Sequence, residues 1–184
     1  MNLPHGTPDG NERPPQRGVL VLLSGLPGSG KTTFARALAG RTKARHFESD
    51  AVRRTMFPAP SYTPRESARV FDELERLAEE ALAARRVVIL DATNLTERDR
   101  RRFLALVSRL GAGLVAVRLT APDHVVRQRL TAPRTGYSEA GLEVFEQMRE
   151  RPEPFRVPTV VVDTRYPLEP SLELVERLVA QEAR

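Results

Sequence analysis

Apolar residues occur along the chain in short continuous runs that are separated by longer, mixed stretches. Four runs are almost wholly aliphatic and a fifth is weaker; they cover residues 19–23, 87–90, 114–119 and 159–162, and residues 44–48. A continuous apolar run of this length is typical of a strand buried on both faces of a parallel sheet. We therefore expect a sheet of five strands, with the weaker run nearer an edge.

The stretches between the runs carry apolar residues at helical spacing. In residues 65–85 they recur three or four positions apart, which is the stripe of an amphipathic helix. Similar patterns cover residues 31–39, 96–110 and 170–183. Thr96 and Glu97 are candidates for capping the helix at their position. Strands that alternate with helices predict an α/β fold, with right-handed crossovers and a doubly wound parallel sheet.

Two segments depart from this alternation. Residues 1–17 are polar and rich in Pro, Gly and Asn, and we expect a disordered N-terminal tail before a single domain at 18–184. Residues 122–158 contain five prolines and two short helical patterns, at 125–131 and 139–149. This stretch is interpreted as a helical lid that leaves the sheet between the last two strands.

Composition narrows the class of protein. The chain has 184 residues, of which 40 % are hydrophobic, and this fits one globular domain. Its longest apolar run is too short to span a bilayer and its beginning does not resemble a signal peptide, so we expect a cytoplasmic protein without a membrane partner. The absence of cysteine excludes disulfides, thiolate metal sites and a cysteine nucleophile.

The charge of the chain permits two interpretations. A net charge of +5 could attract polyanions such as nucleic acid. The alternative is a compositional bias, because only two lysines, Lys31 and Lys43, stand against 27 arginines. With such a bias, scattered arginines are weak evidence for a functional role, whereas a lysine is stronger evidence because it is rare.

A glycine-rich motif follows the first apolar run directly. Residues 25–32 read Gly-Leu-Pro-Gly-Ser-Gly-Lys-Thr and satisfy the pattern G-x-x-x-x-G-K-[ST] in full. Glycines let such a loop adopt positive φ angles and bring backbone N–H groups close to phosphate oxygens, and the following helix directs its positive end at the same anion. A chance match would lack this context of strand and helix. The predicted ATP-binding residues are Gly25, Pro27, Gly28, Ser29, Gly30, Lys31, Thr32 and Thr33.

The same region predicts a Mg²⁺ site. Lys31 can reach the β- and γ-phosphates of ATP, and the Thr32 hydroxyl can bind the metal. Asp91 follows the run at 87–90, where a carboxylate suits a direct or water-mediated hold on Mg²⁺. The alternative for Asp91 is a cap on the helix that begins near Thr96.

Asp50 and Arg53 are candidates for the acceptor side. They follow the run at 44–48 and lie three residues apart, so one helix face can present both. Asp50 could accept the proton of an attacking hydroxyl, while Arg53 neutralises acceptor charge or holds the base. The alternative is a surface ion pair in which Asp50 is the helix N-cap.

Arginines in the predicted lid are candidates for stabilising the transferring phosphoryl group. Arg127, Arg129 and Arg134 fall within eight residues, and a closing lid could bring them to the phosphates and exclude water. The alternative is a solvated helix face in an arginine-rich protein. The arginine runs at 85–86 and 100–102 are expected to be solvated surface.

With these motifs in this order, residues 18–165 resemble a P-loop kinase of the nucleotide-kinase class. More narrowly, they are similar to the predicted AAA-type small kinases and to the 5′-kinase module of phage-type polynucleotide kinases. The resemblance implies the strand order 2-3-1-4-5, Asp50 as general base with Arg53 as its partner, and Asp91 at the metal. It also implies that one lid arginine lies near adenine and one near the phosphates, without assigning Arg129 and Arg134 between them, because their spacing is one residue longer than in related kinases.

The sequence therefore predicts a kinase that transfers the γ-phosphate of Mg·ATP to an acceptor hydroxyl. The favoured acceptor is a polynucleotide 5′-hydroxyl end, although only Phe57 and Tyr62 are available near the acceptor side for stacking bases. One alternative is a small-molecule kinase acting on a nucleoside, a sugar or an antibiotic. Another is a P-loop ATPase or nucleotide-gated module without an acceptor, in which Asp50 and Arg53 would have no role.

Overall fold

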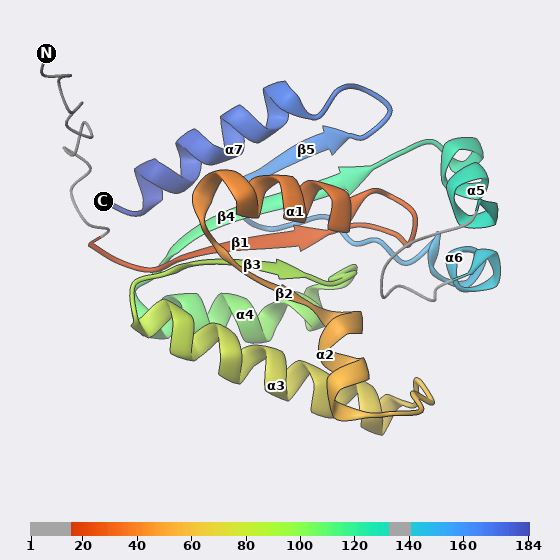
Figure 1. Ribbon diagram of the computed structural model, residues 1–184, viewed down its shortest axis with the longest axis horizontal. Coiled ribbons are helices and arrows are strands. Elements are labelled where there is room, and N and C mark those ends of the chain that lie inside the picture. The colour runs from red at the N-terminus through yellow and green to blue at the C-terminus, as the bar shows by residue number, and fades with distance from the viewer. Residues whose placement is uncertain (1–15, 133–140) are drawn as a thin grey trace, which may run out of the picture.

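A single parallel sheet forms the centre of the molecule (Figure 1). The computed structural model describes residues 16–132 and 141–184. The strands are β1 (Val19–Ser24), β2 (Arg45–Glu48), β3 (Val87–Asp91), β4 (Gly113–Thr120) and β5 (Thr159–Asp163). All neighbours pair in parallel, in the order β2-β3-β1-β4-β5. The predicted fold class and strand order are confirmed, and the weaker run is an edge strand.

Helices cover both faces of this sheet (Figure 1). They are α1 (Lys31–Thr42), α2 (Ser49–Met56), α3 (Pro64–Ala83), α4 (Glu97–Leu110), α5 (Asp123–Thr131), α6 (Leu142–Met148) and α7 (Glu169–Glu182). In the figure α1 and α7 lie on one face and α3 and α4 on the other, whereas α2, α5 and α6 lie toward the carboxyl ends of the strands. Among the described residues, no helix is both long and apolar enough to cross a membrane.

The central strand explains why its sequence is a continuous apolar run. Val19, Val21 and Leu23 pack in the core beneath α1 and α7, while Leu20 and Leu22 pack in the core beneath α3 and α4. Successive side chains of a strand point to opposite faces, so a strand with helices on both sides favours apolar residues, and in β1 the last residue, Ser24, is the polar one. All six residues of β1 are buried.

The helix after β3 begins as the sequence indicates. Thr96 is the N-cap of α4 and accepts a hydrogen bond from the Asp99 amide, while the Asp99 carboxylate accepts one from the Thr96 amide. The partner in this capping box is Asp99, not Glu97. Residues 1–15 of the predicted tail and 133–140 of the predicted lid lie outside the described residues.

We expected the arginine run at 100–102 to lie on the surface, but Arg100 is buried. It is only 2 % exposed, although it stands between charged neighbours in the sequence. Three consecutive helical residues point in widely different directions, so one member of the run faces inward, on the side that also carries Phe103 and Val107. A run of arginines therefore cannot be assigned to solvent as a unit.

The buried guanidinium of Arg100 joins two distant segments. It donates to the carbonyl oxygens of Asn94 at 3.0 Å, Leu95 at 2.8 Å and Pro154 at 2.9 Å. It also stacks on Phe155, with 4.2 Å from Cζ to the ring centroid. Burial lowers the pKa of Arg100, and the carbonyl oxygens and aromatic ring replace the water that the charge has lost. The loop after β3 is thereby fixed against the chain that returns from α6.

Replacing Arg100 with Met should therefore destabilise the protein. The variant keeps a long side chain but leaves buried carbonyl oxygens without donors, and we expect the free energy of unfolding to fall by about 3 kcal/mol. Urea denaturation followed by circular dichroism measures this change. The matched control is Arg101→Met, since Arg101 is exposed on the same helix and should alter stability by no more than about 0.5 kcal/mol. Equal stability of the two variants would contradict the structural role of Arg100.

Candidate active site

A cleft of about 940 Å³ opens at the carboxyl ends of the strands. In open α/β sheets this is the edge at which ligands bind. The cleft brings together residues from the phosphate loop, α2, β3 and α5. Those predicted from the sequence are Pro27, Gly28, Gly30, Lys31, Thr32, Thr33, Asp50, Arg53, Asp91 and Arg129. Arg134 lies outside the described residues.

The loop between β1 and α1 has the geometry of a phosphate cradle. Gly28 and Gly30 have φ angles of 76° and 90°, a region that residues with a Cβ rarely occupy. Helix α1 starts directly after Gly30, and among the described residues no side chain caps it and no acid stands in its first turn. Its first amides and its positive dipole end are therefore available to an anion.

Lys31 extends its ammonium group across this loop. Nζ donates a hydrogen bond to the carbonyl oxygen of Leu26 at 2.9 Å. Burial lowers the pKa of Lys31, and the nearby carboxylates of Asp91, Asp50 and Glu48 oppose this shift. The Lys31 amine therefore lies next to the cradle, with three carboxylates nearby.

Asn94 holds the phosphate loop from one side. Its side-chain amide donates to the Leu23 carbonyl at 2.8 Å, and its own carbonyl accepts from the Ser24 hydroxyl at 3.0 Å. The Gly25 amide donates to the Thr93 carbonyl at 3.0 Å. Asn94 is fully buried and has a φ angle of 44°, which Asn tolerates better than most residues. The end of β1 and the start of its loop are thus bonded to the loop after β3.

Thr164 and Arg129 hold the phosphate loop from the other side. The Thr164 hydroxyl donates to the Ser29 carbonyl at 2.9 Å and accepts from the Arg129 guanidinium at 2.8 Å. Arg129 also donates to the Thr164 carbonyl at 2.7 Å and to the Gly28 carbonyl at 3.3 Å. The arginine of α5 is therefore bonded to the cradle. Sequence reasoning missed Thr164, because a single threonine after an edge strand carries no local signal.

Arg127 has a different role from Arg129. Its guanidinium forms an ion pair with Glu146 at 2.6 Å and lies over Phe145 at 5.8 Å from the ring centroid. These contacts connect α5 to α6, where Phe145 also packs with Val126 and Leu130 in a separate small core. Arg127 thus stabilises this helix pair, and it does not line the cleft.

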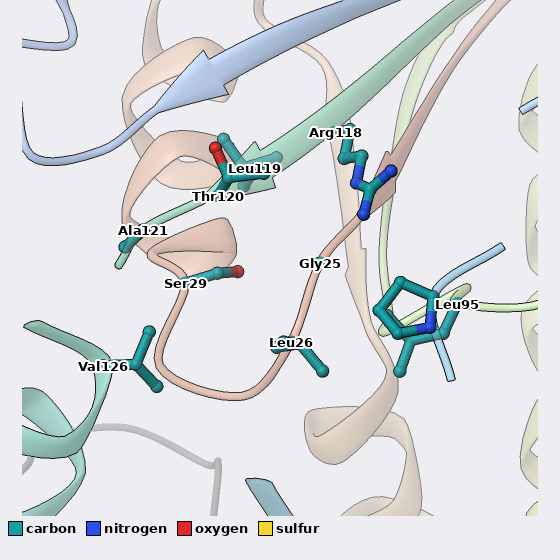
Figure 2. A pocket seen from close by; sticks show the side chains of 10 residues that line it. Gly25, Leu26, Ser29, Leu95, Arg118, Leu119, Thr120, Ala121 and Val126 are labelled. Atoms are coloured by element: carbon teal, nitrogen blue, oxygen red, sulfur yellow. The ribbon is translucent and has the colours of Figure 1, made fainter. Parts of the chain in front are cut away.

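A small cavity of about 70 Å³ lies behind the loop (Figure 2). Gly25, Ser29 and Arg118 are among the residues that line it. The Ser29 hydroxyl is buried and has no hydrogen-bond partner among the described residues. Ser29 and Gly25, both predicted to bind ATP, line this cavity and are not part of the cleft lining, so any contact of theirs with a nucleotide would come from the backbone.

Asp91 ends β3 at the wall of the cleft and is 2 % exposed. The cap of α4 consists of Thr96 and Asp99, which argues against the alternative that Asp91 caps this helix. Thr32 lines the same cleft, so a hydroxyl and a carboxylate face one space. Oxygen ligands of this kind, combined with the phosphates of a nucleotide, are those that Mg²⁺ prefers. The residues present fit the predicted metal.

Asp50 stands in the first turn of α2 and lines the cleft. The N-cap position of α2 is occupied by Glu48, so Asp50 is not the helix cap that we had considered as the alternative. A carboxylate in the first turn of a helix is favoured by the helix dipole in its ionised form. Asp50 therefore presents a carboxylate to the cleft that also contains the phosphate loop.

Arg53 is directed at α3. Its guanidinium donates to Glu66 at 2.6 Å and to the Ser67 hydroxyl at 3.2 Å, and it lies over Tyr62 at 4.7 Å from the ring centroid. Burial would raise the pKa of Glu66, but hydrogen bonds from Ser61, Arg53 and the Tyr62 amide lower it to about 2. Glu66 is thus an anion at neutral pH, and the pair fixes α2 against α3. The remaining donor, Arg53 Nε, is buried without a partner among the described residues, in a side chain that lines the cleft.

Comparison with known proteins identifies the family and the fold. Residues 20–155 match the family model of the AAA domain. No curated protein matches the chain at the level of sequence. Among solved structures, Kti12 from Chaetomium thermophilum, in complex with ADP-AlF3, is 18 % identical, with a TM-score of 0.72 over 90 % of this chain and 99 % of that one.

Two further structures share the fold. A sugar kinase from Janibacter sp. is 23 % identical, with a TM-score of 0.66 over 90 % of this chain and 95 % of that one. The APS kinase CysC from Mycobacterium tuberculosis, solved with AMPPNP and APS, is 16 % identical, with a TM-score of 0.67 over 90 % and 99 % of the two chains. The chain therefore belongs to the AAA domain family and has the fold of the P-loop kinases.

Proposed function

We propose that the protein is an ATP-dependent kinase that phosphorylates a hydroxyl group of a small molecule. The observation that carries the proposal is the position of Asp50, which shares one cleft with Lys31 and Thr32 of the phosphate loop. A plain ATPase or nucleotide-gated module has no use for a carboxylate at this point. The proposed nucleotide is ATP, with Mg²⁺ at Thr32 and Asp91.

The proposed acceptor is a small molecule and not the polynucleotide 5′-hydroxyl end that the sequence analysis favoured. Related folds with identified substrates include a sugar kinase, a gluconokinase and an APS kinase, and each of these substrates is small. The acceptor side also offers few aromatic faces. Phe57 packs with the core around α3, and the Tyr62 ring is occupied on one face by Arg53. Among the described residues, Phe71 is the other aromatic side chain of the cleft lining, and these rings do not form an extended stacking surface for a strand of bases.

The reaction follows from the positions of the cleft residues. The phosphate loop and Lys31 bind and orient the β- and γ-phosphates, and Asp50 accepts the proton of the acceptor hydroxyl as its oxygen attacks phosphorus. Bound Mg²⁺ would neutralise charge on the phosphate oxygens. Arg129, bonded to the loop from α5, adds positive charge to the nucleotide side. Arg53 positions α2 through its bonds to Glu66 and Ser67 of α3.

Transfer of labelled γ-phosphate to a panel of acceptors tests this function. The panel contains sugars, gluconate, nucleosides, APS, aminoglycosides and a 5′-hydroxyl oligonucleotide. We expect label on one of the small molecules and none on the oligonucleotide. Label on the oligonucleotide alone would restore the polynucleotide hypothesis. Release of inorganic phosphate at an equal rate with and without every acceptor would favour an ATPase.

Replacing Lys31 with Ala should abolish most of the transfer. The variant removes the cation that compensates phosphate charge, and loss of one such group typically costs about 10²- to 10³-fold in rate. The rate of γ-phosphate transfer measures the effect, and thermal denaturation checks the fold. The control is Lys43→Ala, since Lys43 is the other lysine and is exposed at the end of α1. Near-normal transfer in Lys31→Ala would refute the role of the loop.

Replacing Asp50 with Asn should separate transfer from ATP binding. The amide keeps the size of the side chain but cannot take a proton, so we expect transfer to fall by about 10²- to 10⁴-fold. ATP affinity, measured by calorimetry, should stay within a few-fold, because the loop and α5 supply those contacts. Asp72→Asn, on the exposed side of α3, is the control. Full activity of Asp50→Asn, or an equal loss of ATP affinity, would contradict its assignment as the base.

A further inference from the structure

Three side chains with metal-binding atoms meet where β2 and β3 end. His46 and Glu48 are two residues apart on β2 and so point to the same face of the sheet. The strand register places Glu48 beside Asp91 and His46 beside Ile89. Ile89 belongs to the core beneath α1, whereas Phe47 packs in the opposite core. The cluster therefore lies on the α1 side, next to the cleft.

The distances within this cluster suit a metal ion. One ligand atom from each of His46, Glu48 and Asp91 lies within 4.8 Å of the other two. His46 Nε2 and Asp91 Oδ2 are 3.2 Å apart. Nitrogen and oxygen ligands of a tetrahedral metal stand about 3.4 Å from one another, since each is about 2.1 Å from the ion. The spacing of these three atoms is thus close to that of ligands around one ion.

The cluster also concentrates negative charge in a buried position. Glu48 is 8 % exposed and Asp91 2 %, so two carboxylates are buried side by side. The ion pair that Glu48 forms among the described residues is long, at 3.5 Å to the half-exposed Arg36. Lys31 lies near these acids, but its hydrogen bond goes to the Leu26 carbonyl. Buried carboxylates that lie side by side require a cation or a proton between them.

We propose that His46, Glu48 and Asp91 bind a divalent transition-metal ion such as Zn²⁺ or Co²⁺. An imidazole with two carboxylates suits these ions, whereas Mg²⁺ prefers oxygen ligands alone. This site shares Asp91 with the proposed magnesium site. Its other two ligands, His46 and Glu48, come from β2 and are not part of the magnesium site. Glu48 and Asp91 line the cleft, which leaves an open position on the ion for water or for a phosphate oxygen. Because Asp91 is shared, an ion held here competes with the use of Asp91 for Mg·ATP.

Metal binding is tested on the full chain without an affinity tag and without nucleotide. Co²⁺ is titrated and followed by visible absorption, and Zn²⁺ is titrated in a calorimeter. We expect one ion per chain, retained in millimolar Mg²⁺. His46→Gln should weaken the affinity at least about tenfold, because it removes the nitrogen ligand. The control changes the other two histidines, His5→Gln with His124→Gln, and should keep the affinity of the wild type.

A second variant makes the test independent of the folding of the first. Glu48→Gln keeps the shape of the side chain and removes its charge, and it should also weaken Zn²⁺ binding about tenfold. Circular dichroism establishes which variants are folded, and a folded variant decides the outcome. The proposal is overturned if the wild type binds neither ion, if a folded site variant binds as tightly as the wild type, or if the control variant loses binding. None of these outcomes depends on the kinase activity.

Discussion

The structure depends on the hydrogen bonds that hold the phosphate loop between its two neighbours. The order of the sheet places β1 between β3 and β4, so the loop after β1 has a neighbouring loop on each side. Asn94 bonds it from the β3 side, and Thr164, which follows β5, bonds it beyond β4. A loop with glycines at positive φ is costly to order, and these bonds fix its shape before any ligand binds. The shape of the phosphate loop is thus determined by the topology of the sheet.

The two sides of the cleft are stabilised by separate sets of contacts. On the nucleotide side, Arg129 and Thr164 connect α5 to the loop. On the acceptor side, the buried pair of Arg53 and Glu66 joins α2 to α3, without a direct bond to the loop. Between them lie Asp91 and the two β2 residues His46 and Glu48, where carboxylates and an imidazole gather under the first turns of α1. Charge is therefore distributed across the cleft, with Lys31 and Arg129 at the phosphate loop and the carboxylates of Glu48 and Asp91 at the ends of β2 and β3.

The sequence predicts those features that depend on neighbours in the chain. Strands appear as apolar runs because burial on both faces leaves no alternative, and the phosphate loop is a local motif whose context can be read directly. Arg100 could not be placed, because its orientation depends on which side of α4 faces the core. Thr164, His46 and Glu48 were missed because their neighbours come from other strands, and only the register between strands brings them together. Arg53 was identified, but its partner on α3 was not, since Glu66 lies thirteen positions further along the chain, beyond an irregular segment.

The corner formed by α2 and α3 has a consequence for how such proteins diversify. Its buried pair ties these helices to each other, while the phosphate loop is held by the loops after β3 and β5. In the proposed reaction, substitutions on the cleft-facing surface of α2 and α3 would change which hydroxyl meets Asp50 without disturbing the residues around Lys31. In this view, related proteins would keep the same phosphate loop and its supports while the surface of α2 and α3 varies among them. One scaffold could then serve substrates as different as sugars and nucleotides.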